Sequence, residues 1–158
     1  MKKVMVRAEK CLSCHSCELA CAVAHSQQKN LFLTILNGEK PVNRVQVEKT
    51  SQGAMPLQCR HCDDAPCLLA CMTGAIYRAG DGSVQLKRER CVSCWMCIMS
   101  CPYGVMLTEA EGKAVKCDLC HDTGKPSCVQ ACPTQALVYE EGEEFAAAIR
   151  KNYAKNLI

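Results

Sequence analysis

The sequence predicts an α+β fold organised around bound metal, and three observations lead to that prediction. The chain has 158 residues, and 16 of them are cysteines. These cysteines recur in four groups of four, separated by patterns typical of short strands and of helices of one or two turns. Aromatic residues make up only 4% of the chain, so little apolar bulk remains once the cysteines are set aside. Metal binding would therefore supply much of the folding free energy.

The third cysteine group shows which metal the sequence favours. Residues 91–102 read CVSCWMCIMSCP, which is the C-x2-C-x2-C-x3-C-P run that holds iron–sulfur clusters in bacterial proteins. Three thiolates on such a tight loop bind one cluster, and the fourth binds a second cluster. We expect the fourth cysteine, Cys101, to begin or lie on the following helix and to point away from the loop.

The other three groups repeat this pattern with changes in spacing, and no cysteine is left over. The intervals are x2, x2, x3 in the first quartet, x2, x4, x3 in the second and x2, x7, x3 in the fourth. Such self-similarity indicates an internal repeat. The four quartets are Cys11, Cys14, Cys17 and Cys21; Cys59, Cys62, Cys67 and Cys71; Cys91, Cys94, Cys97 and Cys101; and Cys117, Cys120, Cys128 and Cys132.

Three other uses of the cysteines fit the sequence less well. Structural zinc sites take two well-separated cysteine pairs, which is a different pattern. A disulfide framework requires export, and the N-terminus has neither an apolar signal region nor a twin-arginine pair, so a cytoplasmic location is expected. A redox-active C-x-x-C needs a thioredoxin-like context, which is absent. The quartets therefore favour four 4Fe-4S clusters.

No catalytic group accompanies the cysteines. The sequence has no Walker A loop and no dinucleotide-binding glycine motif. The four histidines, His15, His25, His61 and His121, lie in or near the ligand loops, but complete quartets leave them no iron to bind. The formal charge of +3 counts the thiolates as neutral, and the basic residues are scattered, so a nucleic-acid surface is not favoured. Electron transfer is the chemistry that remains, and we expect no enzymatic activity.

Strand patterns occur between the quartets. Two hairpins are predicted, with turns at 79–82 and at 109–112, because glycine-rich turn residues separate apolar segments there. The predicted strands are Lys3–Val6, Ala75–Arg78, Val84–Leu86, Gly104–Leu107, Ala114–Lys116 and Ala136–Glu140.

Two segments lie outside the repeat. Residues 26–53 form a predicted β-rich insertion, in which 45–47 reads as a strand and Leu31–Leu36 as either a strand or a helix. This insertion would either cover a cluster pair or dock a partner. Residues 143–158 form a predicted C-terminal helix with an apolar stripe of Phe145, Ile149, Tyr153 and Leu157. The stripe would pack either on its own domain or against a partner.

The four quartets, over residues 11–133, resemble the four-cluster iron–sulfur subunits of the DMSO reductase and formate dehydrogenase family. The second quartet with its x4 interval and the widened fourth quartet carry this resemblance. Residues 17–26, CELACAVAHS, look most like the CooF-type electron-transfer partner of nickel carbon monoxide dehydrogenase.

The resemblance implies two fused bacterial-ferredoxin-like halves. The first half would consist of residues 1–25 and 103–142, and the second of residues 54–102. It also implies that the quartets are used crosswise, first with fourth and second with third. The spacing alone leaves open the alternative of first with second and third with fourth. The implied ligand sets are Cys11, Cys14, Cys17 and Cys132; Cys21, Cys117, Cys120 and Cys128; Cys59, Cys62, Cys67 and Cys101; and Cys71, Cys91, Cys94 and Cys97.

The family also implies a function and partners. The protein would relay low-potential electrons from carbon monoxide dehydrogenase to hydrogenase or another redox partner, as part of a hetero-oligomer. An equivalent role in a formate dehydrogenase or hydrogenase complex is the alternative, and a structural iron–sulfur or zinc adaptor is a further one. We expect no membrane span, because no apolar run approaches the ~20 residues that one requires.

Overall fold

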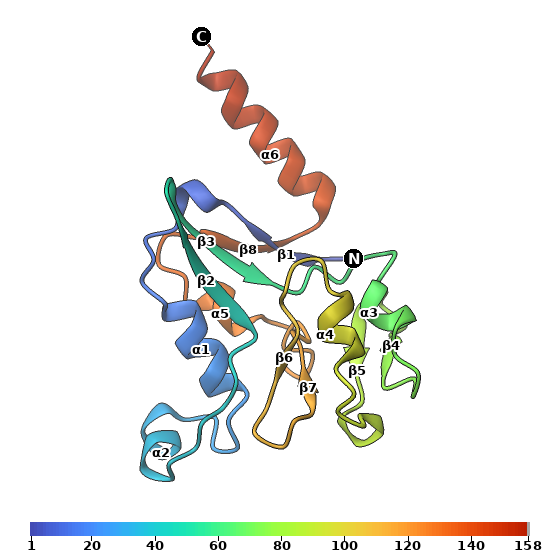
Figure 1. The fold of residues 1–158 in the computed structure, drawn as a ribbon. Coiled ribbons are helices and arrows are strands. Elements are labelled where there is room, and N and C mark those ends of the chain that lie inside the picture. Colours follow the sequence, from blue (N-terminus) through green and yellow to red (C-terminus); the bar gives the residue numbers. More distant parts are fainter. Residues whose placement is uncertain (158) are drawn as a thin grey trace.

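The computed structural model describes residues 1–157 as an α+β fold of short elements (Figure 1). Its helices are α1 (Ser16–Ala24), α2 (Leu31–Leu36), α3 (Pro66–Leu69), α4 (Met96–Ser100), α5 (Ser127–Gln130) and α6 (Gly142–Lys155). Its strands are β1 (Lys3–Val6), β2 (Val45–Thr50), β3 (Gly53–Gln58), β4 (Ile76–Arg78), β5 (Val84–Leu86), β6 (Leu107–Thr108), β7 (Ala114–Val115) and β8 (Leu137–Glu140). Each strand has one antiparallel partner, so the sheets are two-stranded ribbons.

The first and last strands pair with each other. Strand β1 runs antiparallel to β8, with Lys3 opposite Glu140 and Val6 opposite Leu137. Val4 and Leu137 are buried, and their side chains belong to one apolar core. The terminal amine adds an ion pair of 2.9 Å with Glu141. The N-terminal segment is thereby joined to the segment that follows the fourth quartet.

The two predicted hairpins are present, although one is shorter than expected. Strands β4 and β5 pair over three residues, with Ile76 opposite Leu86. Strands β6 and β7 pair over only two, with Leu107 opposite Val115. Gly82 and Gly112 have φ angles of 87° and 78°, which glycine adopts without the steric cost that other residues incur, and so they allow the tight turns.

The insertion is only partly β-structured. Leu31–Leu36, which the sequence left open, is the helix α2, whose first N–H groups donate to the side chain of Asn30. Strand β2 is present, but its partner β3 extends to Gln58. The hairpin therefore crosses the predicted boundary between the insertion and the second half, because its pairing continues up to the second quartet.

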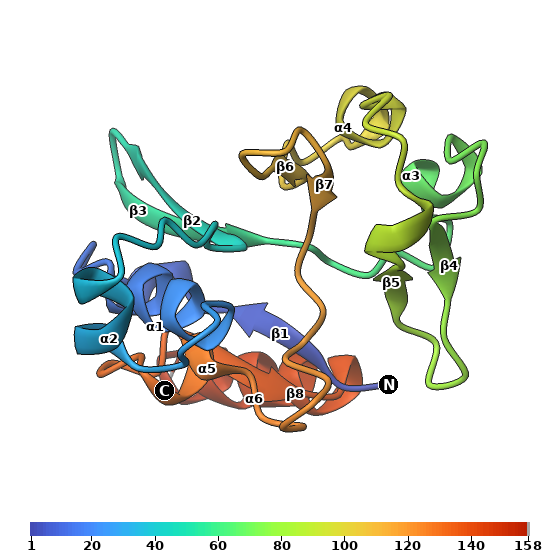
Figure 2. The same cartoon turned by 90° about the horizontal axis from the view of Figure 1, so that it is seen from below.

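Two separate apolar cores each contain cysteines. The helices that contribute to them lie on opposite sides of the molecule in Figure 2, with α1 and α5 on the left and α3 and α4 on the right. In the first core α1 packs against α5, and in the second α3 packs against α4. Met106 and Ala114 lie in the second core. The β6–β7 hairpin and the residue before it thus pack with Cys67 and Cys97 of the second and third quartets and with the β4–β5 hairpin.

The C-terminal helix is present and projects from the body of the molecule (Figure 1). Of its predicted apolar stripe, Phe145 is half-buried, with the guanidinium of Arg7 5.5 Å from the ring centroid. Ile149, Tyr153 and Leu157 are exposed, and Leu157 lies beyond the end of the helix. Packing of the helix on the rest of the chain is therefore strongest near its start, where residues 145–147 are half-buried. Residue 158 lies outside the described residues.

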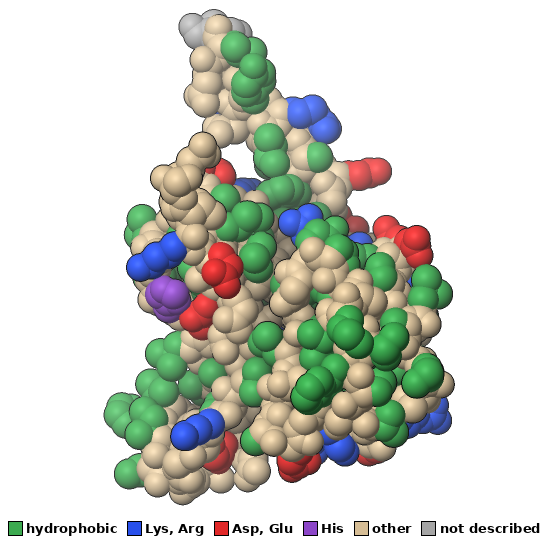
Figure 3. Space-filling view, viewed as in Figure 1, with side chains coloured by type: hydrophobic (Ala, Val, Ile, Leu, Met, Phe, Trp, Pro, Cys, Tyr) green, Lys and Arg blue, Asp and Glu red, His purple; other side chains and the backbone are tan. Residues whose placement is uncertain are grey.

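Helix α2 has an inverted distribution of side chains. Phe32, Leu33, Ile35 and Leu36 are exposed, and Figure 3 shows apolar side chains gathered over this helix at the lower left. Thr34 is buried, with its Oγ1 2.9 Å from Ser26 Oγ and 2.7 Å from the carbonyl oxygen of Asn30. A polar contact, and not an apolar face, anchors this helix to the body.

Among residues 1–157, no helix has both the length and the apolar character that a membrane-spanning segment requires.

Candidate metal centre

The third cysteine of each quartet occupies the same structural position. Each is the second residue of a short helix, and each is at most 9% exposed. A helix that begins one residue earlier fixes the backbone of this cysteine and turns its thiol toward the core. These four residues are Cys17 on α1, Cys67 on α3, Cys97 on α4 and Cys128 on α5.

The fourth cysteine is placed differently from the sequence expectation. Cys101 does not begin or lie on a following helix; it caps the C-terminus of α4. Cys71 and Cys132 likewise follow helix ends, at Ala70 and Ala131. Cys21 alone of the four lies within a helix, because α1 is long enough to include it. The x3 interval therefore separates the third and fourth cysteines by about one helical turn. In the last three quartets the third cysteine lies at the start of the short helix and the fourth at or just after its C-terminal end.

Left-handed backbone conformations shape the ligand loops. Ser13 and His15 have φ angles of 56° and 58°, and the corresponding Ser93 and Trp95 have 58° and 60°. This conformation costs about 1–2 kcal/mol for a residue with a side chain. The same conformation recurs at matching positions of two quartets, and such backbone strain is typical of functional sites. His61, Leu119 and Cys120 show the same conformation in the other two loops.

Backbone N–H groups in and around these loops point at sulfur. Hydrogen bonds to a cysteine sulfur favour its charged form and influence the reduction potential of a bound cluster. The donors and acceptors are Arg44 N–H to Cys21 at 3.2 Å, Ala136 to Cys132 at 3.2 Å, His61 to Cys59 at 3.4 Å, Ile76 to Cys71 at 3.4 Å, Leu119 to Cys117 at 3.4 Å and Ser127 to Cys120 at 3.5 Å.

Two cavities in the second core are each lined by four cysteines. One cavity is lined by Cys59, Cys62, Cys67 and Cys101, the other by Cys71, Cys91, Cys94 and Cys97. Each set takes three cysteines from one quartet and the fourth cysteine of another. The structure thus brings together in each cavity the four residues that the family resemblance groups.

The first core contains most of the remaining cysteines. Burial, with the Cys117, Cys21 and Cys120 sulfurs nearby, raises the pKa of Cys128. Burial also raises the pKa of Cys17 to about 11, with Cys132 among its charged neighbours. Cys11 is half-buried and Cys14 is exposed. Cysteines of the first and fourth quartets are therefore neighbours in space.

These cysteines suit a metal cluster better than disulfides. All sixteen are free thiols although they lie in groups. Burial raises the pKa of Cys97 to about 11 and that of Cys117 to about 12. A thiolate at such a position needs a bound cation for its stability. Grouped thiols, inward N–H donors and cysteine-lined cavities together fit iron–sulfur clusters.

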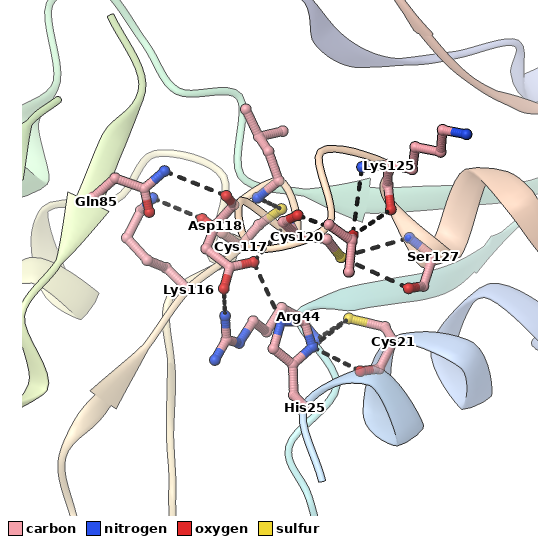
Figure 4. A network of polar contacts seen from close by, with 12 residues as sticks. Cys21, His25, Arg44, Gln85, Lys116, Cys117, Asp118, Cys120, Lys125 and Ser127 are labelled. Atoms are coloured by element: carbon pink, nitrogen blue, oxygen red, sulfur yellow. Dashed lines mark hydrogen bonds and ion pairs between the residues drawn. The ribbon is translucent and has the colours of Figure 1, made fainter. Parts of the chain in front are cut away.

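A charged network borders Cys21 in the first core (Figure 4). Asp118 pairs with both His25 and Arg44 and accepts a 2.9 Å hydrogen bond from the Cys120 N–H. Burial opposes charge on His25, but its hydrogen bonds with Asp118 and Cys21 outweigh burial and raise the pKa of His25 to about 10. Burial would also raise the pKa of Asp118, but the hydrogen bond from His25 and the Arg44 guanidinium hold it well below its usual range.

A second polar group lies between the two cores. Lys116 is buried, and its Nζ donates to the carbonyl oxygens of Val84 and Cys117. The Val84 N–H in turn donates to Nδ1 of His61, which is fully buried. Burial, followed by the charge of Lys116, lowers the pKa of His61 to about 3.

Little in the amino-acid sequence indicates these two polar groups. Asp118 and Lys116 flank Cys117, which marks them as neighbours of a ligand. Their partners Arg44 and Val84 are 74 and 32 residues away. No local pattern reports such pairings, and only the folded chain identifies them.

Comparisons with known proteins agree with this geometry. A family described as the 4Fe-4S dicluster domain matches residues 50–142. An iron-sulfur protein of Rhodospirillum rubrum is 41% identical over 98% of this chain and 90% of its own. The electron transport protein HydN of Escherichia coli is 37% identical over 85% of each chain. The thiosulfate reductase electron transfer subunit PhsB of Salmonella typhi is 35% identical over 89% of this chain and 77% of its own.

The family match covers more than half of the chain, and the relatives are similar over most of their lengths. Their names describe iron–sulfur and electron-transfer proteins. The chain belongs to the 4Fe-4S dicluster domain family and is an iron–sulfur electron-transfer protein.

Proposed function

We propose that the chain is a relay of four 4Fe-4S clusters, in which quartets are shared crosswise. Site I would be held by Cys11, Cys14, Cys17 and Cys132; site II by Cys21, Cys117, Cys120 and Cys128; site III by Cys59, Cys62, Cys67 and Cys101; and site IV by Cys71, Cys91, Cys94 and Cys97. The observation that carries this proposal is the pair of cavities, each lined by one complete cysteine set.

Neighbouring cysteines support a linear order from site I to site IV. The charges that act on Cys128 in site II include Cys17 of site I. Those that act on Cys117 in site II include Cys59 of site III, which also packs against the first core. Those that act on Cys97 in site IV include Cys67 of site III. Each proposed site thus adjoins the next, and Cys117 and Cys59 connect the two halves.

Each bound cluster would accept and release one electron at a time, which is the chemistry that the chain itself does not supply. The chain would contribute the remaining requirements. Loops with inward N–H groups stabilise the thiolates, and buried helix positions keep water from the clusters. Exposed Cys14 and Cys94 lie in the outer sites I and IV, where electrons would enter and leave.

For the redox partners we propose a carbon monoxide dehydrogenase as donor and a hydrogenase as acceptor, in a cytoplasmic hetero-oligomer. The resemblance of residues 17–26 to CooF-type proteins supports this choice. A formate dehydrogenase or hydrogenase complex is the second candidate. The relatives HydN and PhsB are named as electron-transfer proteins, and neither name mentions carbon monoxide dehydrogenase. In either case the chain would carry electrons and catalyse no substrate reaction of its own.

Two measurements test this function. Anaerobically prepared protein should contain about sixteen irons and sixteen sulfides per chain and should titrate as several one-electron centres. Mixing the protein with carbon monoxide dehydrogenase and CO should then reduce those centres. Far fewer irons after reconstitution would contradict the relay, whereas full iron content without reduction by CO would contradict only the proposed donor. Zinc in place of iron would indicate an adaptor.

A further inference from the structure

His61 is a buried side chain that the proposed ligand sets do not use. It lies between Cys59 and Cys62, and its exposed fraction is 0%. A buried polar atom that has no hydrogen-bond partner destabilises the folded state. Among residues 1–157, no atom forms a hydrogen bond with Nε2 of His61. That atom therefore requires a partner that the polypeptide does not supply.

The hydrogen-bond pattern of the ring identifies which nitrogen carries the proton. Nδ1 accepts a hydrogen bond of 3.1 Å from the Val84 N–H, so Nδ1 has no proton of its own. A neutral imidazole with an unprotonated Nδ1 carries its proton on Nε2. The neighbouring Lys116, whose ammonium group is fixed by the Val84 and Cys117 carbonyl oxygens, disfavours a second positive charge. The free atom of His61 is thus a donor.

The residue that carries this donor lines the site III cavity. His61 lines that cavity together with Cys59, Cys62, Cys67 and Cys101. His61 has a φ angle of 46°, a conformation that costs energy for histidine and that fixes where its ring can reach. Val84, whose N–H donates to Nδ1 of the ring, lines the same cavity.

We propose that His61 donates its Nε2 hydrogen to a sulfur of the cluster in site III and raises the reduction potential of that cluster. The inference rests on the relay proposed above. A hydrogen bond to a cluster sulfur stabilises the reduced state more than the oxidised state, because the reduced cluster is the more negative. Site III is the first site beyond the Cys117–Cys59 junction. His61 would therefore favour electrons crossing between the halves, as a hydrogen-bond donor to the cluster and not as an iron ligand.

Two variants separate the role of Nδ1 as an acceptor from the role of Nε2 as a donor. His61→Asn keeps an oxygen that accepts from the Val84 N–H, loses the Nε2 donor, and suits the positive φ, since asparagine tolerates this conformation. His61→Gln places an amide N–H near the former Nε2 and should restore part of the effect. His121→Asn is the matched control, because His121 also lies in a ligand loop but is exposed.

Redox titration followed by electron paramagnetic resonance gives the readout. In His61→Asn one of the four centres should move to lower potential, with a tenfold smaller reduced-to-oxidised ratio at a fixed potential, about 59 mV for one electron. The other three centres and the iron content should not change. Four unchanged centres at full iron content would overturn the inference while leaving the relay intact, and a loss of about four irons would identify His61 as a ligand or support and overturn it too.

A measurement on the unmutated protein covers the case in which the variants fail to assemble. Hyperfine spectroscopy of reduced wild-type protein with 15N-labelled histidine should show a weakly coupled nitrogen with an exchangeable proton. A strongly coupled, directly bonded nitrogen, or no coupling at all, would contradict the proposed hydrogen bond. Wild-type protein that holds no clusters would overturn the relay itself, and this inference with it.

Discussion

The backbone N–H of Arg44 donates a hydrogen bond of 3.2 Å to Sγ of Cys21, which joins the insertion to a proposed ligand of site II. The guanidinium of the same residue pairs with Asp118, on the loop between Cys117 and Cys120. Arg44 therefore holds two sides of site II together. Through Arg44, the insertion therefore contributes to the structure around site II.

Replacing Asp118 by asparagine tests this network. The amide retains an acceptor for the Cys120 N–H but removes the charge that pairs with His25 and Arg44. We expect a destabilisation of about 1–3 kcal/mol and faster loss of one cluster, because two half-buried cationic groups lose their partner. The loss of visible absorbance in guanidinium measures this effect. Asp122→Asn, at an exposed acid in the same loop, should match the wild type.

The pKa of His25 predicts how the stability of site II depends on pH. Its folded pKa of about 10 exceeds its unfolded value of about 6.5, so the charged imidazolium stabilises the folded state. This contribution is complete below pH ~6.5 and is lost as pH rises through ~10. The difference in cluster-loss rate between wild type and His25→Gln should shrink across that range. A difference that stays constant with pH would contradict an imidazolium at this position.

Trp95 is predicted to protect site IV. It lines the cavity of that site, and its Nε1 donates a 2.7 Å hydrogen bond to the Gly112 carbonyl oxygen. Trp95→Gly removes the ring, while glycine readily adopts the φ angle of 60°. We expect the loss of one cluster in air to accelerate several-fold, because solvent reaches it. Trp95→Phe, which keeps a ring, should lose that cluster at an intermediate rate.

The ligand loops and the hairpins could be predicted from the sequence, because short local patterns specify them. The cysteine spacing indicated the ligand loops, and the glycine turns at Gly82 and Gly112 indicated both hairpins. From the sequence we expected the fourth cysteine of the third quartet to begin or lie on a helix. Cys101 instead ends α4, because a five-residue helix closes before reaching it.

Contacts between distant residues were not predictable in this way. Six residues from Leu31 to Leu36 are too few for periodicity to separate helix from strand, and the Asn30 cap and the buried Thr34 decided the outcome. The packing of the β6–β7 hairpin on the second core also depends on long-range contacts. In the sequence, His61 was distinguished only as a histidine in a ligand loop. The folded chain shows that its Nδ1 accepts a hydrogen bond from the Val84 N–H and that, among residues 1–157, its Nε2 has no partner.

Helix α2 allows a direct test of its inverted arrangement. Thr34→Val keeps the shape but removes the hydroxyl that contacts Ser26 and Asn30, so we expect a loss of about 1 kcal/mol and faster amide exchange in α2. Phe32→Ser alters a side chain that is 76% exposed and should change the stability by less than about 0.5 kcal/mol. A larger cost for Phe32→Ser than for Thr34→Val would show that the apolar face is covered.

The crosswise sharing of cysteines predicts which double variants behave as one. In the proposed arrangement Cys101 and Cys59 hold the same cluster, so Cys101→Ala, Cys59→Ala and the combination should each lose about four irons. Cys101 and Cys91 hold different clusters, so Cys101→Ala with Cys91→Ala should lose about eight. If each quartet instead held its own cluster, the pair with Cys91 would lose four and the pair with Cys59 eight. Sharing of the third quartet with the fourth would instead lose eight irons in both double variants. Iron analysis of three single and two double variants therefore distinguishes these three arrangements for the clusters that Cys59, Cys91 and Cys101 hold.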